Sequence, residues 1–424
     1  MIPHDTFNTV CMIGLGYIGL PTAAMFAARR TRVIGVDINR HAVDTINLGR
    51  IHIVEPELDM IVHSAVTAGY LRATTAPEAA DAFLIAVPTP FKGDHEPDIS
   101  FVRAAALSIA PVLQAGNLVV LESTSPVGTT EAMVRWLADA RPDLRFPVEG
   151  GSGPVDVNVT YCPERVLPGH VVRELVENDR IIGGLTARCS ERAVALYRTF
   201  VKGQLLVTNA RTAEMCKLTE NSFRDVNIAF ANELSLICDR LDIDVWELIR
   251  LANHHPRVNI LQPGAGVGGH CIAVDPWFIV DKTPEQARLI RTAREVNDGK
   301  PAWVIGKIVE AIERLGRLDS APAEPTIALL GLAFKPNIDD LRESPALQIV
   351  QALVRSVRAR YLIVEPNVAQ APSGLDSHPL VDVQAAVAQA DIVVLLVAHK
   401  EFAALAGTFG ADQIVIDAVG LLSR

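Results

Sequence analysis

The chain has 424 residues, of which 49% are hydrophobic and 21% charged, and it contains 28 glycines and 26 prolines. This composition is typical of a globular protein of two or three domains, and it excludes a disordered, collagen-like or disulfide-framework chain. The net charge of −10 and the lack of any lysine- or arginine-rich block argue against a nucleic-acid partner.

Short β-branched runs alternate with alanine-rich amphipathic stretches in the first two hundred residues, which predicts a parallel sheet with crossover helices. We expect strands at residues 9–13, 32–37, 83–87, 118–122 and 157–161, and an edge strand at 181–184.

The first of these strands leads into a G-x-G-x-x-G motif, Gly14-Leu15-Gly16-Tyr17-Ile18-Gly19. Glycines in this order allow a tight turn, the approach of a pyrophosphate and close packing of helix on strand, and the helix N-terminus attracts the phosphates. Asp37 ends the second strand, where a carboxylate holds ribose hydroxyls and repels a 2′-phosphate. The pattern therefore predicts NAD rather than NADP, although Arg40 weakens that discrimination. The alternative is a glycine turn without a ligand.

A long helix is expected from about residue 211 to 240, and its stretch 228–237 is apolar nearly all round. Such a stretch is buried either in a domain core or in a subunit interface. Three polar residues share one face of this helix: Lys217, Asn221 and Arg224. This face is either a solvent-exposed polar stripe or part of a functional site. Asp244 and Glu247 indicate the start of a second helix ending near 253.

A glycine-rich loop, residues 262–269, precedes Cys271, and Asp275 follows four residues later. Cys271 is either a small buried side chain or a nucleophile that the glycines make accessible. The polar segment 254–257 (His-His-Pro-Arg) lies just before the loop and lacks the ligand set of a metal site. Thr283 to Gln286 indicates another helix start, and that helix runs toward 317 with a kink or break at 299–301.

A linker-like segment at 318–325 precedes a second α/β region with strands at 326–331, 361–365, 391–397 and 413–417. We therefore expect three domains, at residues 1–207, 208–320 and 321–424. The first and the last α/β regions contain similar residue pairs at corresponding positions. Ile13-Gly14 corresponds to Leu330-Gly331, and Val36-Asp37 corresponds to Val364-Glu365. The segments 331–335 and 339–345 place cations beside a helix start, which suits a second phosphate-bearing ligand.

Membrane-spanning and secretory segments are not expected. No apolar run approaches the roughly 18 residues of a membrane span, and the N-terminus lacks the basic and apolar regions of a signal peptide. The six cysteines show no paired spacing, so we expect reduced thiols in a cytoplasmic protein.

Together these segments resemble the UDP-glucose/GDP-mannose dehydrogenase family over essentially the whole chain. The resemblance rests on GLGYIGLP, VPTP, ESTSPVGTT, CPER, Lys217 with Asn221, PGAGVGGHC and GLAFKPNIDDLRESP, in that order. The segments 164–169, 177–184 and HHPRVNI, with His270, resemble the UDP-N-acetylhexosamine branch. The fold implied is two Rossmann-like α/β domains joined by a central helical domain.

The resemblance implies a four-electron oxidation of a sugar C6 hydroxyl to a carboxylate with two NAD, through a thiohemiacetal and a thioester on Cys271. The substrate implied first is UDP-N-acetyl-D-mannosamine, with UDP-N-acetylglucosamine, UDP-N-acetylgalactosamine or UDP-glucose as alternatives. A two-electron β-hydroxyacid-type dehydrogenase is a more remote alternative, because it needs neither Cys271 nor a third domain. The family also implies a homodimer built on the central helices.

The site residues implied by the resemblance fall into three groups. Lys217 and Asn221 stabilise the oxyanion, and Asp275 and Glu164 handle protons and water. The residues that contact NAD, beyond the glycines of the motif, are Tyr17, Ile18, Asp37, Thr89, Thr124 and Arg342. Besides Lys217 and Asn221, the residues that line the UDP-sugar site are Arg165, Val166, Arg224, His255, Arg257, Gly268, Phe334 and Lys335. No metal is implied.

Overall fold

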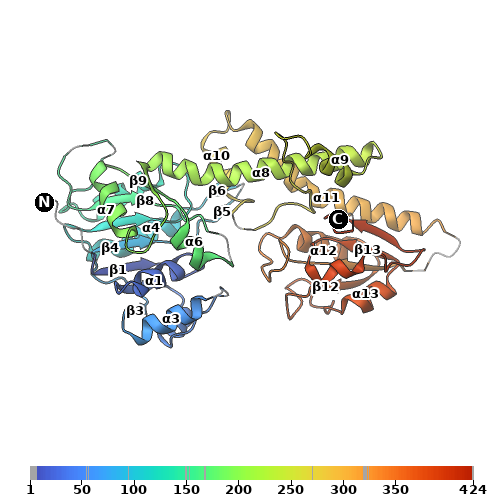
Figure 1. Cartoon of the computed structure of the whole chain (residues 1–424), viewed down its shortest axis with the longest axis horizontal. Helices are drawn as coiled ribbons and strands as arrows, with labels where there is room; N and C mark the ends of the chain where they lie inside the picture. Colours follow the sequence, from blue (N-terminus) through green and yellow to red (C-terminus); the bar gives the residue numbers. More distant parts are fainter. Residues whose placement is uncertain are drawn as a thin grey trace. The chain divides into compact units, whose positions relative to one another are not determined.

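The structure is a computed structural model that describes residues 7–422 except 54, 56, 94, 149, 152, 167–168, 270, 319–321 and 323 (Figure 1). It consists of two compact units, Met1–Thr219 and Glu220–Arg424, and the boundary between them falls inside the long helix α8 (Ala210–Arg240). Part of the predicted linker, and the domain boundary predicted between residues 320 and 321, lie outside the described residues.

The first unit is built on a sheet that, within its described residues, has eight strands in the order β10-β9-β8-β7-β4-β1-β2-β3. Six neighbouring strands of this sheet are parallel to one another, namely β3, β2, β1, β4, β7 and β8. The next strand, β9, runs antiparallel to β8 and parallel to β10. The strands are β1 (Thr9–Ile13), β2 (Arg32–Val36), β3 (Leu71–Thr74), β4 (Ala82–Ile85), β7 (Leu118–Leu121), β8 (Asn158–Tyr161), β9 (Arg180–Gly184) and β10 (Leu205–Asn209). A separate hairpin pairs β5 (Phe91–Lys92) with β6 (Glu96–Pro97).

The predicted α/β architecture is confirmed, but the two outer strands, β3 and β10, were not predicted, and one predicted strand has the wrong position in the sheet. Residues 181–184 form a strand, yet not an edge strand, because β10 pairs with the outer side of β9. The half-exposed segment Leu205–Asn209 has a weak hydrophobic pattern, so the sequence did not reveal it as the true edge.

Helices cover both faces of this sheet, which explains why β4 and β7 are buried along their whole length. One face packs against α1 (Gly19–Ala28), α2 (Arg40–Asn47), α3 (Leu58–Thr67), α6 (Val171–Glu177) and α7 (Ala187–Tyr197). The other face packs against α4 (Ser100–Ile109), which a 3-10 turn (Ala110–Val112) extends, against α5 (Thr129–Ala140), and against the first turn of α8.

The second unit opens with helices: the rest of α8, then α9 (Val245–Ala252), α10 (Asp275–Lys282) and α11 (Arg288–Leu315). Asp244 caps α9 as predicted, since its carboxylate accepts the N–H groups of Trp246 and Glu247. The helix start predicted at Thr283 is wrong, because Thr283 ends α10 and its hydroxyl donates to the Ile279 carbonyl. Of the kink or break predicted at residues 299–301, the break is wrong, because α11 continues through Pro301.

Buried polar side chains join α8 to α11. Arg294 donates to Asp225 at 2.6 Å, and Asn297 donates to the same carboxylate at 2.8 Å and accepts from Asn232 at 2.8 Å. The opposite side of α8 stays open: Phe230 is 53% exposed. Within one chain, residues 228–237 are therefore not buried on all sides.

The second unit ends in a parallel sheet of order β12-β11-β13-β14, and all four predicted strands are confirmed. They are β11 (Thr326–Leu330), β12 (Arg360–Val364), β13 (Ile392–Leu395) and β14 (Ile414–Asp417). One face packs against α11 and α12 (Pro345–Ser356), the other against α13 (Val383–Gln389) and a 3-10 helix (Lys400–Leu405). No described helix is both long and apolar enough to cross a membrane.

Candidate active site

The G-x-G-x-x-G motif lies where the strand order of the first sheet reverses, between β1 and β4, which is where open α/β sheets bind ligands. Gly14 has φ = 91°, and a Cβ there would meet the Ala86 carbonyl oxygen at 2.4 Å. A Cβ on Gly19 would meet the Gly14 carbonyl oxygen at 1.8 Å, whereas one on Gly16 meets nothing within 4 Å. The fold thus requires the first and third glycines, and the space beside the second is open to a ligand.

The residues around this space fit a dinucleotide. Ile18 makes no side-chain cap at the N-terminus of α1, and the positive end of the helix dipole there attracts a pyrophosphate. Asp37 follows β2 and accepts the N–H groups of Leu15 at 2.9 Å and Asn39 at 2.8 Å, which fixes its carboxylate at the adenosine end. A carboxylate has four lone-pair sites, so two bonds leave room for ribose hydroxyls. Of the other two predicted contacts here, Tyr17 is exposed and Ile18 is the residue before α1.

Hydrogen bonds join the loops that follow β4 and β7. The Thr89 hydroxyl donates to the Thr124 carbonyl at 2.6 Å, so these two predicted NAD contacts lie side by side. The Ser123 hydroxyl accepts from the Val87 N–H at 2.9 Å and donates to the Val87 carbonyl at 2.8 Å. Arg342, the remaining predicted contact, belongs to the second unit, where it pairs with Asp340 at 2.6 Å.

Glu164 follows β8 in the first unit and is buried. One carboxylate oxygen accepts the Arg165 N–H at 2.6 Å, and the other accepts a guanidinium N–H of the buried Arg180. The Arg165 side chain reaches the Asp179 carbonyl at 3.2 Å, and Val166 packs partly buried against the core. Leu167 and Pro168 lie outside the described residues.

The predicted catalytic cysteine and carboxylate share one turn in the second unit. Cys271 is half-buried, and its carbonyl accepts the Asp275 N–H at 2.8 Å where α10 begins. Asp275 is buried, and its carboxylate accepts an amide N–H of Asn221 from α8. Lys217, one turn earlier on α8, is half-buried and belongs to the first unit. His270 lies outside the described residues.

The glycine loop before Cys271 is packed against the C-terminal part of the same unit. A Cβ on Gly268 would meet the Glu343 carbonyl oxygen at 2.5 Å and the Phe334 Cβ at 2.8 Å. One on Gly266 would meet Pro345 at 2.8 Å, and Gly264 donates to the Asn232 amide oxygen at 2.9 Å. Close packing therefore explains why residues 266 and 268 are glycines. The sequence alone had suggested only that these glycines make Cys271 accessible to a ligand.

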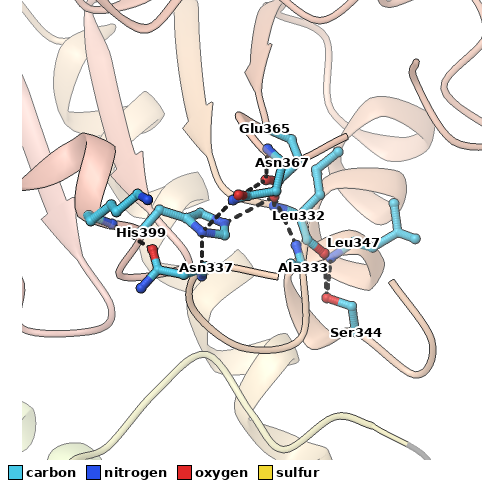
Figure 2. Close-up of polar contacts among 9 residues, drawn as sticks. Leu332, Ala333, Asn337, Ser344, Leu347, Glu365, Asn367 and His399 are labelled. Atoms are coloured by element: carbon cyan, nitrogen blue, oxygen red, sulfur yellow. Dashed lines mark hydrogen bonds and ion pairs between the residues drawn. The ribbon is translucent and has the colours of Figure 1, made fainter. Parts of the chain in front are cut away.

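The ends of β11, β12 and β13 meet in a buried polar cluster (Figure 2). Glu365 follows β12 and accepts the N–H groups of Leu332 at 2.7 Å and Ala333 at 3.0 Å. Gly331 repeats the backbone of Gly14, with φ = 98° and a 2.8 Å bond from its N–H to the Val364 carbonyl. The similarity between Asp37 and Glu365 in the sequence is therefore also a similarity of structure, because each carboxylate accepts N–H groups of a glycine turn.

His399, after β13, completes this cluster, and the sequence did not identify it. Its Nδ1 accepts the Asn337 N–H at 2.9 Å, which leaves Nε2 to donate to Glu365 at 3.1 Å. Burial alone raises the pKa of Glu365, but the bonds from His399 and from backbone N–H groups outweigh it and lower the pKa to about 2. The cluster fixes the loop that carries Phe334 and Lys335.

The remaining predicted substrate residues lie at the surface of the second unit. Arg224, His255 and Arg257 are exposed, and the His255 ring accepts the Arg257 N–H at 3.3 Å. Lys335 is partly buried, with its Nζ 5.8 Å from the Phe334 ring centre. Among the described residues, no group of three or more His, Cys, Asp or Glu side chains is arranged to hold a metal ion.

Comparison with known proteins identifies relatives over the whole chain. Residues 8–201, 211–299 and 328–424 match, respectively, the NAD binding, central and UDP binding domains of the UDP-glucose/GDP-mannose dehydrogenase family. The UDP-N-acetyl-D-mannosamine dehydrogenase of Salmonella typhi is 64% identical over 418 residues, which are 98% of this chain and 99% of that protein. The NDP-N-acetyl-D-galactosaminuronic acid dehydrogenase of Ralstonia nicotianae is 62% identical over 417 residues, 98% of this chain and 97% of that protein. The solved structure of UDP-D-ManNAc dehydrogenase from Pyrococcus horikoshii is 41% identical, with a TM-score of 0.86 and coverage of 97% of this chain and 96% of that one.

Proposed function

This chain belongs to the UDP-glucose/GDP-mannose dehydrogenase family and carries its NAD-binding domain, and on that basis we propose that it oxidises UDP-N-acetyl-D-mannosamine to UDP-N-acetyl-D-mannosaminuronate. Relatives named for that sugar, at 64% and 62% identity, support the choice. The galactosamine sugar is the second candidate, because a relative named for the galactosaminuronic acid is 62% identical. UDP-N-acetylglucosamine and UDP-glucose remain further alternatives with the same chemistry.

The observation that carries the chemistry is the turn from Cys271 to Asp275, tied to α8 through Asn221. In the proposed reaction the C6 hydroxyl loses a proton and a hydride to give an aldehyde, to which the Cys271 thiolate adds. The resulting thiohemiacetal loses its hydroxyl proton and a second hydride to become a thioester. Water then attacks the thioester and releases the carboxylate and the thiol. NAD, when bound, supplies the hydride acceptor for each of the two oxidations.

Polar side chains handle charge and protons in this scheme. Lys217 and the second amide N–H of Asn221 stabilise the oxyanion that develops at the reacting carbon. Asp275 accepts from the Asn221 amide and so orients it. Glu164 accepts the proton of the attacking water as a general base.

Substrate binding and domain roles complete the proposal. Residues 328–424 match the UDP binding domain, and we assign its Phe334 and Lys335 to contacts with the nucleotide. Arg257, in the segment that matches the central domain, is assigned to the diphosphate. We assign residues 1–207 to NAD binding, 208–320 to the catalytic helices and 321–424 to the UDP-sugar. Six free cysteines are the usual state of thiols in a reducing compartment, which supports a cytoplasmic location.

The test counts NADH per sugar with a panel of the four UDP-sugars and with Cys271→Ala. The unmodified protein forms two NADH per sugar, fastest with UDP-N-acetyl-D-mannosamine, and Cys271→Ala forms no uronate while still binding NAD. Cys216→Ala is the matched control, because Cys216 is also half-buried but has no role in the scheme. One NADH per sugar, or uronate from Cys271→Ala, would indicate two-electron chemistry.

A homodimer through the central helices is part of the proposal. An apolar stripe runs along α8 and ends just past it: Phe223 is 67% exposed, Phe230 53% and Ile237 47%, and Leu241, the residue after the helix, is 61% exposed. A groove of about 600 Å³ adjoins the stripe, and it is lined by Leu236, Ile237, Leu241 and Val296 together with Gly299 and the charged Glu233, Arg240 and Glu295. A soluble monomer rarely exposes several large apolar side chains in one region.

Light scattering tests this assembly. Phe230→Asp places a charge in the middle of the stripe and yields monomer or aggregate. Phe101→Asp is the control, because Phe101 is a 42% exposed phenylalanine on α4, in the other unit, and its replacement leaves the dimer intact. A monomeric unmodified protein would contradict the proposal.

A further inference from the structure

A buried ionic cluster in the first unit surrounds Glu164 and contains groups that the proposed chemistry does not use. Arg180, at the start of β9, donates to Glu164 and lies 3.7 Å from an oxygen of Glu122, which follows β7. The Tyr197 hydroxyl, at the end of α7, donates to that same Glu122 oxygen at 2.5 Å. None of these four side chains is more than 8% exposed.

The charges of this cluster do not balance. Two carboxylates share one guanidinium, and the other titratable groups that face Arg180 are Cys162, 3.8 Å away, and the Tyr197 phenol. Burial raises the pKa of Cys162 to about 12, so it remains a neutral thiol. Burial also raises the pKa of Glu122 to about 7, against the opposing effect of Arg180. Apolar side chains of similar volume are generally no less stabilising than such a group of buried charges.

The geometry around Arg180 restrains Glu164. The guanidinium lies over the Tyr197 ring, 4.7 Å from its centre, and close to the Phe200 ring, at 5.6 Å. It therefore has little freedom to move, and it holds one oxygen of Glu164 while the Arg165 N–H holds the other at 2.6 Å. Both oxygens of the carboxylate are fixed by the protein.

We propose that Arg180 is the positioning residue for Glu164, and that Glu122 and Tyr197 in turn hold the Arg180 guanidinium in place. This inference rests on the proposed role of Glu164 as the base in thioester hydrolysis. A displaced guanidinium would leave one oxygen of Glu164 without its donor, and the carboxylate could then turn away from the attacking water.

The decisive experiment measures kcat and KM for Arg180→Lys. This variant keeps a charge but not the planar fork, and it lowers kcat at least tenfold with KM for NAD within twofold. Glu122→Gln keeps an acceptor for the Tyr197 hydroxyl, so it lowers kcat by less than Arg180→Lys does.

Asp225→Asn is the matched control, because Asp225 is an equally buried carboxylate paired with a buried arginine, in the other unit. It lowers stability but leaves kcat within twofold of the parent's. A kcat of Arg180→Lys within twofold of the parent's, or an equal loss of kcat in Asp225→Asn, would overturn the inference. Glu164→Gln tests the proposed function separately: unimpaired uronate formation by that variant would remove the role of Glu164 itself.

Discussion

Replacing single glycines of the G-x-G-x-x-G motif by alanine separates the fold from cofactor binding. At Gly19 the new Cβ would lie 1.8 Å from the Gly14 carbonyl oxygen, so the backbone must shift by more than an ångström. We expect a loss of about 3 kcal/mol or more in the free energy of unfolding, the upper end for overpacking. At Gly16 the Cβ meets nothing within 4 Å and φ is not positive. Gly16→Ala therefore keeps or raises stability, by about 0.4–1 kcal/mol through the unfolded chain.

NAD affinity depends most on Gly16, the glycine that matters least for stability, because the pyrophosphate must approach the backbone there. We expect Gly16→Ala to weaken NAD binding at least tenfold, about 1.4 kcal/mol, in a protein that unfolds at the same or higher urea concentration. The assays are calorimetric titration with NAD and urea denaturation followed by circular dichroism. If Gly16→Ala bound NAD normally, or if Gly19→Ala were as stable as the parent, the assignment of the glycines would be wrong.

Three further predictions concern the second unit. Gly268→Ala brings a Cβ within 2.5 Å of the Glu343 carbonyl oxygen, so it should destabilise the unit by about 1–3 kcal/mol and raise KM for the UDP-sugar. Gly306→Ala, on an exposed part of α11, should instead gain about 0.5–1 kcal/mol in urea denaturation. The pKa of Glu365 falls from 4.5 to about 2 on folding, so its ionised form adds about 3 kcal/mol above pH 4.5, which is lost as the pH falls toward 2. Glu365→Gln should therefore be less stable at pH 7 and show a flatter decline between pH 5 and 2, whereas a decline as steep as the parent's would refute the role of this carboxylate.

Local signals in the sequence were sufficient for much of the fold. Apolar runs identify most strands of both sheets, because strands covered on two faces need continuous hydrophobic residues. The glycine motif and Asp37 identify the dinucleotide crevice, because the turn, the helix N-terminus and the carboxylate all lie within one β-α-β segment. Asp244 identifies the start of α9, since capping depends on neighbours only two or three residues away.

Features that depend on partners far along the chain were decided only by the tertiary structure. The sequence pattern placed an edge strand at residues 181–184, but an edge is a property of what pairs beside a strand, and β10 supplies that pairing. The buried ion pairs of Arg180 and the bond between His399 and Glu365 join residues 16 to 58 positions apart, and no local pattern marks them. The glycine loop shows the same limit. Its glycines were evident in the sequence, whereas the packing against Phe334 that requires Gly268 exists only where two distant segments of the folded chain meet.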